Sequence, residues 1–402
     1  MYVKSSAQYC TLSMQLEQIT TAAALGGLLA DARAEGTCAV DTEFVWERTY
    51  APALCLVQLA TATRLAVIDP LAGAPLEPVA ALMADAAVEK VMHAPSGDLA
   101  AFVLHHDVRP RNVFDTQLAA GFAGYGGSPS LERLLEQAVN VKLRHDEGFT
   151  DWARRPLTPV QIEYAADDVR HLLAAAAALR QRLARQGRQA WADEEMQQRY
   201  GEDATLVQDP ELAWRRVSGR GRLRGEQVSA LAAVAAWRER EARRRDLPAS
   251  WLIKDATLIE VARRRPRTAR DAESIRGLQL RKGAQLDGML AAVAAASTVP
   301  PAGAPEGDLP GEVRRRVRVV LPLASAVLQA RCGEAGVASE LVATRAELES
   351  LIAGQAMGGD GMHPLLHGWR RELAGESLLR LLRGEVALRV VPRAPHVTEQ
   401  PA

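Results

Sequence analysis

The stretch that decides the fold runs from Ala39 to Val45 and reads A-V-D-T-E-F-V. Its β-branched and aromatic residues predict a strand, and side chains two positions apart on a strand point to the same face. Asp41 and Glu43 therefore share one face. Two carboxylates on a buried face would repel each other unless a cation lay between them. On a solvated face the same pair would need no cation, so the motif alone leaves both interpretations open.

The segments around this strand predict an α/β domain. Two more β-prone runs, Leu54–Ala60 and Arg64–Ile68, follow closely and predict a meander. A long helical segment is predicted from Pro159 to about Leu183, with Thr158 as its N-cap. Helical and β-prone segments alternate between these regions, which favours an α/β fold. The alternating segments are Leu76–Met83, Val88–Met92, Gly97–Leu104, Val113–Phe114 and Leu131–Ala138.

Further acids occupy positions that would bring them to the same sheet. Asp98 lies in H-A-P-S-G-D-L, just after a predicted strand and at the opening of a helix. Tyr164 and Asp168 are four residues apart in Y-A-A-D-D-V and therefore lie on one helix face. Asp167 points about a quarter-turn away, so we do not expect it to join them.

Five sequence blocks in a fixed order carry a family resemblance. They are D-T-E-F, H-A-x-x-x-D, F-D-T-Q, D-W-x-x-R-P-L and Y-A-A-D-D-V, between Asp41 and Val169. In order and spacing they resemble ribonuclease D, of the DEDDy branch of 3′→5′ exonucleases. The resemblance implies a ribonuclease-H-like mixed sheet flanked by helices. It also implies a metal-dependent exoribonuclease that hydrolyses RNA 3′ ends to 5′-mononucleotides, in tRNA 3′ maturation.

The resemblance also implies a catalytic site. Its four metal-binding acids would be Asp41, Glu43, Asp98 and Asp168, and Tyr164 would orient or help deprotonate the attacking water. Two divalent ions about 3.5–4 Å apart stabilise the attacking and leaving oxygens of an in-line phosphoryl displacement. Hard cations prefer oxygen ligands, so we expect the two ions to be Mg²⁺ or Mn²⁺. We expect no nucleotide cofactor.

Three other residues near these blocks are not assigned to the metal site. Asp115, in F-D-T-Q, is expected to support the scaffold, and His93 is expected to pack at a strand end. His145 stands near the place where the family often carries a lysine. That departure concerns substrate contacts and leaves the acids unchanged.

The zero net charge conceals an uneven distribution. Residues 1–211 carry 18 basic and 28 acidic side chains, residues 212–296 carry 19 and 9, and residues 297–402 carry 12 of each. A basic segment of domain size beside an acidic one is typical of a protein that binds a polyanion. The same arginines would also solubilise an alanine-rich chain, which is the alternative explanation.

The basic segment, residues 211–296, resembles the helical HRDC domain shared by ribonuclease D and RecQ-type helicases. The resemblance rests on Trp237-Arg238, on R-D-L-P from Arg245 and on W-L-I-K-D-A-T from Trp251. Leu231, Val234, Trp237 and Leu252 are predicted to form its core. The basic cluster predicted to contact RNA phosphates comprises Arg243, Arg244, Arg245, Lys254, Arg263, Arg264 and Arg265.

The remaining boundaries follow from composition. Residues 1–210 are assigned to the exonuclease domain, with an extended start or leader at 1–13. A Pro/Gly/Ala-rich linker at 297–311 precedes a second, HRDC-like helical domain at 312–393, with helices to about Val391.

Two alternative functions remain open on sequence grounds. A DNA 3′→5′ exonuclease would use the same acids, and an RNA-binding adaptor would be catalytically silent. The chain contains no G-x-x-x-x-G-K-[ST] motif, which argues against a helicase.

Composition also bears on the setting in which the chain acts. Four scattered cysteines without a C-x-x-C pair indicate a reducing compartment, and we find neither an export signal nor an apolar run of membrane length. We expect a cytoplasmic protein that acts on RNA, with tRNA precursors carrying 3′ extensions as its partners and no membrane association. The sequence does not set its oligomeric state, so a monomer is taken as the default.

Overall fold

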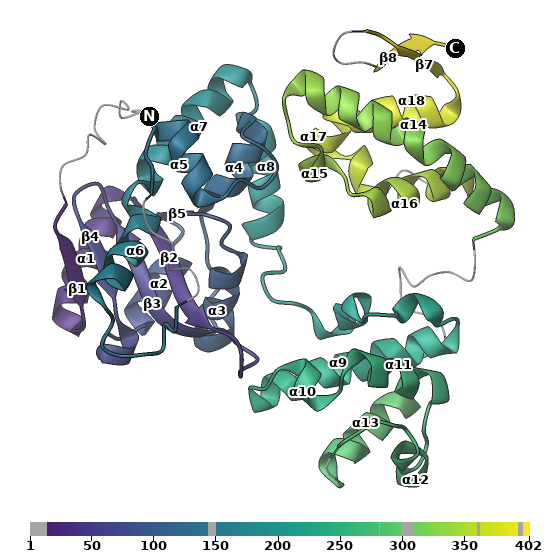
Figure 1. Ribbon diagram of the computed structural model, residues 1–402, viewed down its shortest axis with the longest axis horizontal. Coiled ribbons are helices and arrows are strands. Elements are labelled where there is room, and N and C mark those ends of the chain that lie inside the picture. Colours follow the sequence, from purple (N-terminus) through teal and green to yellow (C-terminus); the bar gives the residue numbers. More distant parts are fainter. Residues whose placement is uncertain (1–13, 144–149, 281, 299–308, 360–361, 393–396) are drawn as a thin grey trace.

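The computed structural model describes residues 14–143, 150–280, 282–298, 309–359, 362–392 and 397–402. The predicted leader, His145 and the central part of the predicted linker lie outside these described residues. The described chain forms an α/β domain, a first helical module at residues 210–298 and a second helical module that begins at Gly311 (Figure 1).

A six-stranded mixed sheet forms the centre of the α/β domain, with strand order β1-β4-β3-β2-β5-β6. The predicted meander is present, because β2 (Thr37–Val45), β3 (Ala53–Ala60) and β4 (Leu65–Ile68) pair antiparallel in sequence. On its other side β2 pairs in parallel with β5 (Glu89–Met92), which pairs in parallel with β6 (Val113–Asp115). Since β2 has neighbours on both sides, the direction of its side chains is firmly set.

The edge strand β1 (Leu16–Ile19) was not predicted from the sequence. It pairs in parallel with β4. Its sequence, L-E-Q-I, is short and contains two polar residues, so neither alternation nor β-propensity distinguishes it from the start of a helix.

Helices flank this sheet, and most begin near their predicted residues. The predicted long helix is interrupted at His171, whose backbone φ of −110° is not helical, and it forms α6 (Pro159–Arg170) and α7 (Leu172–Gln186). Thr158 caps α6 as predicted, in a capping box with Gln161. The other helices of the domain are α1 (Ala22–Glu35), α2 (Glu77–Ala84), α3 (Ser96–His106), α4 (Thr116–Ala123), α5 (Leu131–Val139) and α8 (Gln189–Tyr200).

The first helical module has a hydrophobic core of its own. Leu231 and Val234 are fully buried there and Trp237 packs against the core from its edge, as predicted, whereas Leu252 is buried but lies outside this cluster. Among the described residues this core is a separate cluster from that of the α/β domain. Its helices are α9 (Glu226–Arg245), α10 (Ala249–Leu252), α11 (Asp255–Arg264), α12 (Ala269–Glu273) and α13 (Ala284–Ala294).

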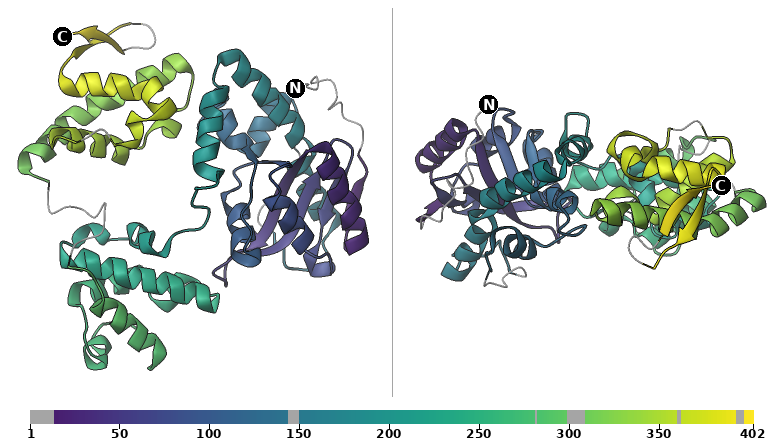
Figure 2. Two further views of the ribbon diagram at one scale, coloured as in Figure 1. Left: turned by 180° about the vertical axis from the view of Figure 1, so that it is seen from behind. Right: turned by 90° about the horizontal axis from the view of Figure 1, so that it is seen from above.

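The second helical module shares its core with the α/β domain. Trp369, 1% exposed, belongs to the same hydrophobic cluster as Phe122 of α4, and their rings meet edge to face at 4.8 Å. Figure 2 shows this module beside α8 when the molecule is seen from behind. Its helices are α14 (Gly311–Ala335), α15 (Ser339–Val342), α16 (Arg345–Ala356), α17 (Gly368–Arg370) and α18 (Glu376–Arg383).

The chain ends differently from the prediction of helices to about Val391. After α18, Gly384 adopts a left-handed conformation with φ of 75° and stops the helix. The strands β7 (Val386–Val390) and β8 (Val397–Pro401) then pair antiparallel. Within the described residues, no helix combines the length and apolarity needed to cross a bilayer.

Candidate active site

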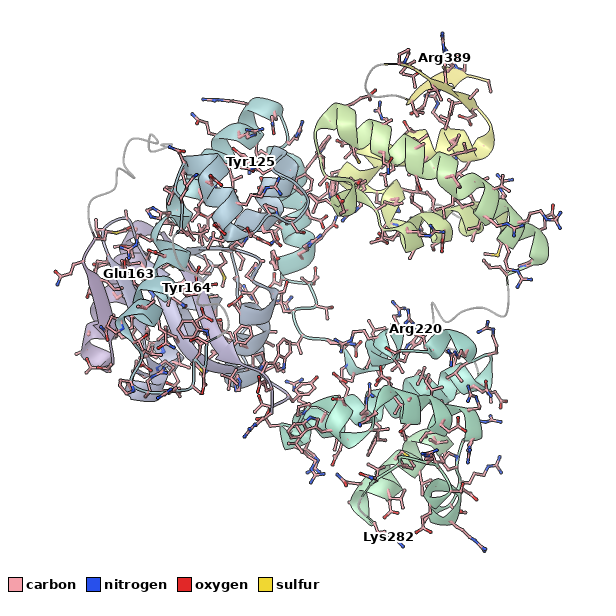
Figure 3. The ribbon with its side chains drawn as sticks, viewed as in Figure 1. Tyr125, Glu163, Tyr164, Arg220, Lys282 and Arg389 are labelled. Carbon is pink, nitrogen blue, oxygen red and sulfur yellow. The ribbon has the colours of Figure 1, made fainter. Side chains whose placement is uncertain are left out.

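An acidic cluster lies where β2 meets α6. Asp41, Glu43 and Asp168 each present a carboxylate oxygen, and these oxygens all lie within 4.8 Å of one another. Asp41 and Glu43 point to the same side because strand residues alternate faces. Helix α6 packs on β2, β3 and β4 and thereby brings Asp168 to that side. Figure 3 places the neighbouring Tyr164 on α6 over the sheet.

Asp98 adjoins the cluster but is not one of the three acids grouped within 4.8 Å. It lies in the first turn of α3 and is 7% exposed. The hydroxyl of Thr42 donates a hydrogen bond to its Oδ1. The negative charge of Asp98 still acts on Asp41 and on Glu43, whose pKa values it raises. The structure therefore gathers all four predicted acids around one end of β2, with Asp98 held against the strand.

The electrostatics of the cluster disfavour its charged form. Burial, followed by the charges of Asp98, Asp168 and Glu43, raises the pKa of Asp41 well above its ordinary value. Burial and the neighbouring acids raise the pKa of Glu43 to about 8, and burial followed by Asp167 raises the pKa of Asp168 to about 7. Among the described residues, no lysine or arginine is ion-paired with these three carboxylates. The described residues thus bring acidic groups together without providing a cation among them.

The backbone around Glu43 is irregular in a way that serves the site. The register between β2 and β3 shifts between Glu43 and Phe44. Such a bulge redirects side chains and is common beside active sites. Gly97, which precedes Asp98, lets α3 come close to this bulge, because an added Cβ would lie 3.1 Å from Cζ of Phe44.

Asp167 does not join the acidic cluster, as predicted, whereas Tyr164 lies on the same face of α6 as Asp168. Tyr164 lies one turn before Asp168 and is partly buried, with its ring 6.0 Å from that of Trp152. Asp167 accepts a hydrogen bond of 2.7 Å from Nε of Arg170 and is not part of the acidic cluster.

The scaffolding roles expected for Asp115 and His93 agree with the structure. One oxygen of Asp115 accepts hydrogen bonds from the backbone N–H groups of Ala94, Gln117 and Leu118, and the other accepts one of 2.7 Å from the hydroxyl of Tyr200. The ring of His93 contacts the Thr116 hydroxyl at 3.0 Å.

Sequence reasoning missed the role of Arg155. Its guanidinium donates two hydrogen bonds of 2.7 Å to Asp69, one from Nε and one from a terminal nitrogen, and also bonds the carbonyl oxygens of Cys55 and Trp152. These contacts hold the loop before α6 against the sheet. The only sequence signal was its place in the D-W-x-x-R-P-L block, which does not reveal a partner 86 residues away.

The seven basic residues predicted to contact RNA do not form one cluster. Arg243, Arg244 and Arg245 end α9, whereas Arg265 pairs with Glu226 at the start of the same helix. Helix α9 has 20 residues. A helix of that length extends about 30 Å, so the cluster predicted from the sequence is divided between the two ends of the module.

Several of these cations already have acidic neighbours. Arg244 pairs with Glu241 at 2.7 Å, and Arg263 and Arg264 pair with Glu260 at 2.8 and 2.7 Å. Such pairs reduce the net positive field of the surface. A role of the seven residues in RNA binding stays a prediction.

Comparison with known proteins places the chain in a family. A model of the 3′–5′ exonuclease family matches residues 16–184, and a model of the HRDC domain matches residues 227–286. Ribonuclease D of Granulibacter bethesdensis is 39% identical over 384 residues, covering 92% of this chain and 94% of the relative. Ribonuclease D of Acidiphilium cryptum is 37% identical, covering 95% and 97%.

A solved structure agrees with these relatives. The crystal structure of Escherichia coli RNase D, described as an exoribonuclease involved in structured RNA processing, superposes with a TM-score of 0.74. It is 34% identical, and the match covers 92% of this chain and 99% of the other. The mixed sheet and the family model define a 3′–5′ exonuclease. The chain belongs to the ribonuclease D family, and it is a 3′→5′ exoribonuclease.

Proposed function

We propose that the enzyme removes nucleotides from RNA 3′ ends as 5′-mononucleotides, with two divalent ions held by Asp41, Glu43, Asp98 and Asp168. The observation that carries this proposal is the convergence of half-buried carboxylates whose pKa values are raised by removal from water and by neighbouring acids. Buried like charges of this kind are stable only when protonated or when a cation joins them.

The donor set fits Mg²⁺ or Mn²⁺. Carboxylate oxygens are the ligands that hard divalent cations prefer, and the cluster offers no thiolate or imidazole that would favour zinc. When bound, such a pair of ions stabilises the charge on the attacking and leaving oxygens of a phosphoryl displacement. Tyr164, one turn before Asp168, is suited to hold the attacking water through its hydroxyl.

The proposed substrates are tRNA precursors with 3′ extensions, and the proposed setting is the cytoplasm. Support comes from the relatives, which are named ribonuclease D, and from the net positive charge of residues 212–296. We propose that the exonuclease domain spans residues 1–210 and that helical domains at 211–296 and 312–393 shape access to it. The seven basic residues named above are proposed to contribute phosphate contacts in two groups rather than one.

Substitution of the acids tests this proposal directly. Asp41→Asn and Asp168→Asn should each lower kcat/KM on a 3′-tailed tRNA about 100-fold or more, because transition-state charge loses its stabilisation. Tyr164→Phe should lower it about 100-fold, the smaller end of what a positioned proton-transfer group contributes. Asp167→Asn, on the neighbouring position of the same helix, is the matched control and should remain active.

Product ladders in Mg²⁺, Mn²⁺ or EDTA complete the experiment. We expect stepwise shortening with either ion and none with EDTA. Full activity of Asp41→Asn or of the EDTA-treated enzyme would contradict the metal site. Equal cleavage of a matched single-stranded DNA would favour the alternative that RNA is not the preferred substrate.

A further inference from the structure

The first helical module meets the α/β domain at the loop that follows β2. Asp246, the residue that ends α9, accepts hydrogen bonds from the N–H groups of Tyr50 at 3.0 Å and Ala51 at 3.1 Å. The Tyr50 hydroxyl donates to Glu239 at 3.2 Å. Figures 1 and 2 both show the end of the β2–β3 hairpin beside α10. We call residues 46–52 together with residues 239–251 the seam.

Two exposed tryptophans belong to the seam. Trp46 is 55% exposed and Trp251 is 61% exposed, whereas the other five tryptophans of the chain are buried or half-buried. Trp46 lies on the loop of the α/β domain, and Trp251 lies on α10 of the first helical module. An exposed indole leaves a large apolar surface in water, and tryptophan is enriched at interaction sites.

Contacts with Tyr50 and Phe44 fix the position of the Trp46 indole but leave more than half of the side chain exposed to solvent. Its Nε1 donates a hydrogen bond of 3.1 Å to the carbonyl oxygen of Tyr50, which itself is bound to Asp246. The ring of Phe44 meets it edge to face, with centroids 6.2 Å apart and an interplanar angle of 78°. Contacts at the edge fix the orientation of the ring and leave aromatic surface for another partner.

Trp46 is also close to the catalytic acids. It follows Glu43 by three residues along an extended segment, and three such residues span about 10 Å. Trp251 follows Asp246 by five residues. Five residues span at most about 18 Å, so Trp251 lies within that distance of Asp246. A strand of RNA whose 3′ end occupies the acidic cluster would therefore reach Trp46 first and Trp251 further upstream.

Cations lie at the same seam. The charges of Arg243 and Arg216 oppose the effect of burial on the pKa of Tyr50, which is raised to about 12. Arg216 also lies 3.5 Å from Glu239 and remains 65% exposed. Exposed guanidinium groups beside exposed aromatic rings form the combination that binds single-stranded nucleic acid, with phosphates on the cations and bases on the rings.

We propose that Trp46 and Trp251 are stacking sites for two bases of single-stranded RNA upstream of the scissile bond, with Trp46 binding the base nearer the 3′ end. The proposal rests on the exoribonuclease function and deepens it, because it assigns the path of the RNA strand away from the acids. Stacking on an aromatic ring tolerates every base, so these sites extend the binding surface without selecting a sequence.

Binding in EDTA tests the proposal without requiring hydrolysis. The probe is a short single-stranded RNA that carries one 2-aminopurine, moved stepwise through the first eight or so positions from the 3′ end. Wild-type protein should quench the probe most strongly at two separate positions, since stacking quenches its fluorescence. Trp46→Ala should abolish the quench nearer the 3′ end, and Trp251→Ala should abolish the other.

The affinity changes should identify stacking as the cause. Each alanine substitution should weaken binding about tenfold, within the range measured for loss of one base–aromatic stack. Trp46→Phe and Trp251→Phe should restore most of the affinity. Val319→Ala is the matched control, because Val319 is 62% exposed on α14, away from the seam, and its loss should change neither affinity nor quenching.

Salt dependence separates stacking from charge. The tryptophan variants should keep the wild-type slope of log affinity against log salt, whereas Arg243→Ala should reduce it by about 0.7, as expected for one lost phosphate contact on a single strand. Wild-type affinity and quenching in both alanine variants, with circular dichroism showing them folded, would overturn the proposal. Failure of the exoribonuclease function itself would appear differently, as intact binding and quenching without cleavage when Mn²⁺ is added.

Discussion

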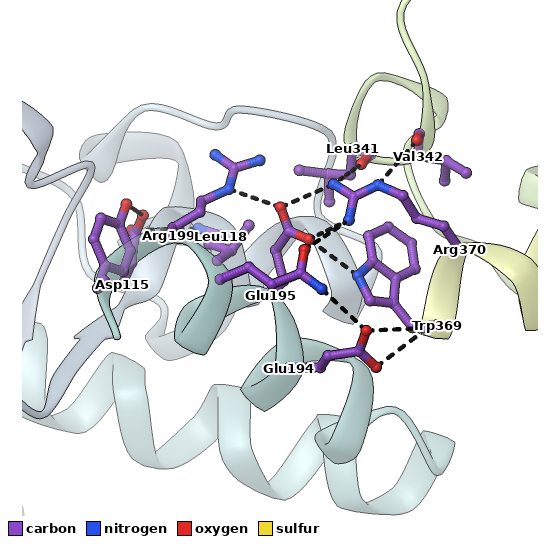
Figure 4. A network of polar contacts seen from close by, with 11 residues as sticks. Asp115, Leu118, Glu194, Glu195, Arg199, Leu341, Val342, Trp369 and Arg370 are labelled. Carbon is purple, nitrogen blue, oxygen red and sulfur yellow. Dashed lines mark hydrogen bonds and ion pairs between the residues drawn. The ribbon is translucent and has the colours of Figure 1, made fainter. Parts of the chain in front are cut away.

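Glu195 is buried and the acids around Asp41 are half-buried, so both places remove carboxylates at least partly from water, but their neighbours differ. Glu195 is 2% exposed and accepts hydrogen bonds from Arg370 at 2.6 and 3.0 Å, from Arg199 at 2.8 Å and from the indole of Trp369 at 3.0 Å (Figure 4). Although burial acts in the opposite direction, Arg370 and Arg199 lower the pKa of Glu195. In the acidic cluster the nearest charges are other carboxylates, and the pKa values rise.

The difference agrees with the proposal that the acidic cluster binds a cation from outside the chain. A buried charge is costly unless an opposite charge and hydrogen bonds compensate it. At Glu195 the second helical module supplies that charge through Arg370, and the pair fastens the module to α8. At Asp41, Glu43 and Asp168 the described residues supply none, so a divalent ion from solvent completes the site in our account.

The largest expected effect comes from removing the internal cation. Arg370→Ala leaves Glu195 buried without its main partner, and breaking a buried pair in this way costs about 3–5 kcal/mol of unfolding free energy. Urea denaturation of the variant and the wild type measures this loss of unfolding free energy. The control is Arg371→Ala, whose pair with Glu376 is 56% and 50% exposed and should contribute about 0–1 kcal/mol. Equal losses in the two variants would contradict the importance assigned to Arg370.

An intermediate effect is expected from pH and metal together. In the folded protein the pKa values of Glu43 and Asp168 are raised to about 8 and about 7, whereas unfolded carboxyl groups titrate near pH ~4. The folded state therefore binds more protons than the unfolded state between about pH 4 and 8, and the stability of the metal-free protein should fall as pH rises through that window.

Added Mn²⁺ should counteract this fall, because cation and protons compete for the same oxygens. At a concentration 100 times its Kd, one ion would stabilise the protein by about 2.7 kcal/mol. Thermal melts at pH 5.5, 7 and 8.5 or so, with Mn²⁺ or EDTA, test this. A Tm increase that is the same at all three pH values would show that the cation binds elsewhere.

The smallest expected effect concerns two conservative substitutions, which should change the free energy of unfolding in opposite directions. Asp41→Asn removes a carboxyl group whose ionisation is opposed by burial and by its acidic neighbours, and should stabilise the metal-free protein by about 1 kcal/mol, as is common when a strained active-site group is removed. Glu195→Gln removes the negative charge that pairs with Arg199 and Arg370, and should destabilise the protein. Parallel urea titrations in EDTA at neutral pH compare them. Destabilisation by both would mean that Asp41 contributes to folding rather than opposing it.

Much of the fold follows from the sequence where local patterns are strong. The meander of β2, β3 and β4 is confirmed, because alternation and β-branched residues specify each strand. The short edge strand β1 and the C-terminal hairpin were missed, since their pairing depends on neighbours that local patterns do not reveal. The break at His171 was also missed, because helical periodicity continues across it.

The candidate site, too, could be predicted from the sequence only in part. The convergence of Asp41, Glu43 and Asp168 could be anticipated from strand alternation, helix spacing and the family resemblance. The hydrogen bond from Thr42 to Asp98 could not, because it joins residues 56 positions apart. Nor could the separation of Arg243 from Arg265, since a basic composition says nothing about which end of a helix each residue occupies.

Isothermal titration calorimetry of the metal-free protein with Mn²⁺ tests the central claim most directly. We expect two ions to bind per chain with release of protons, and we expect Asp41→Asn to weaken or abolish this binding while Asp167→Asn preserves it. Absence of Mn²⁺ binding to the wild-type protein, or binding to Asp41→Asn that equals the wild type, would contradict the claim that these carboxylates bind divalent cations from solvent.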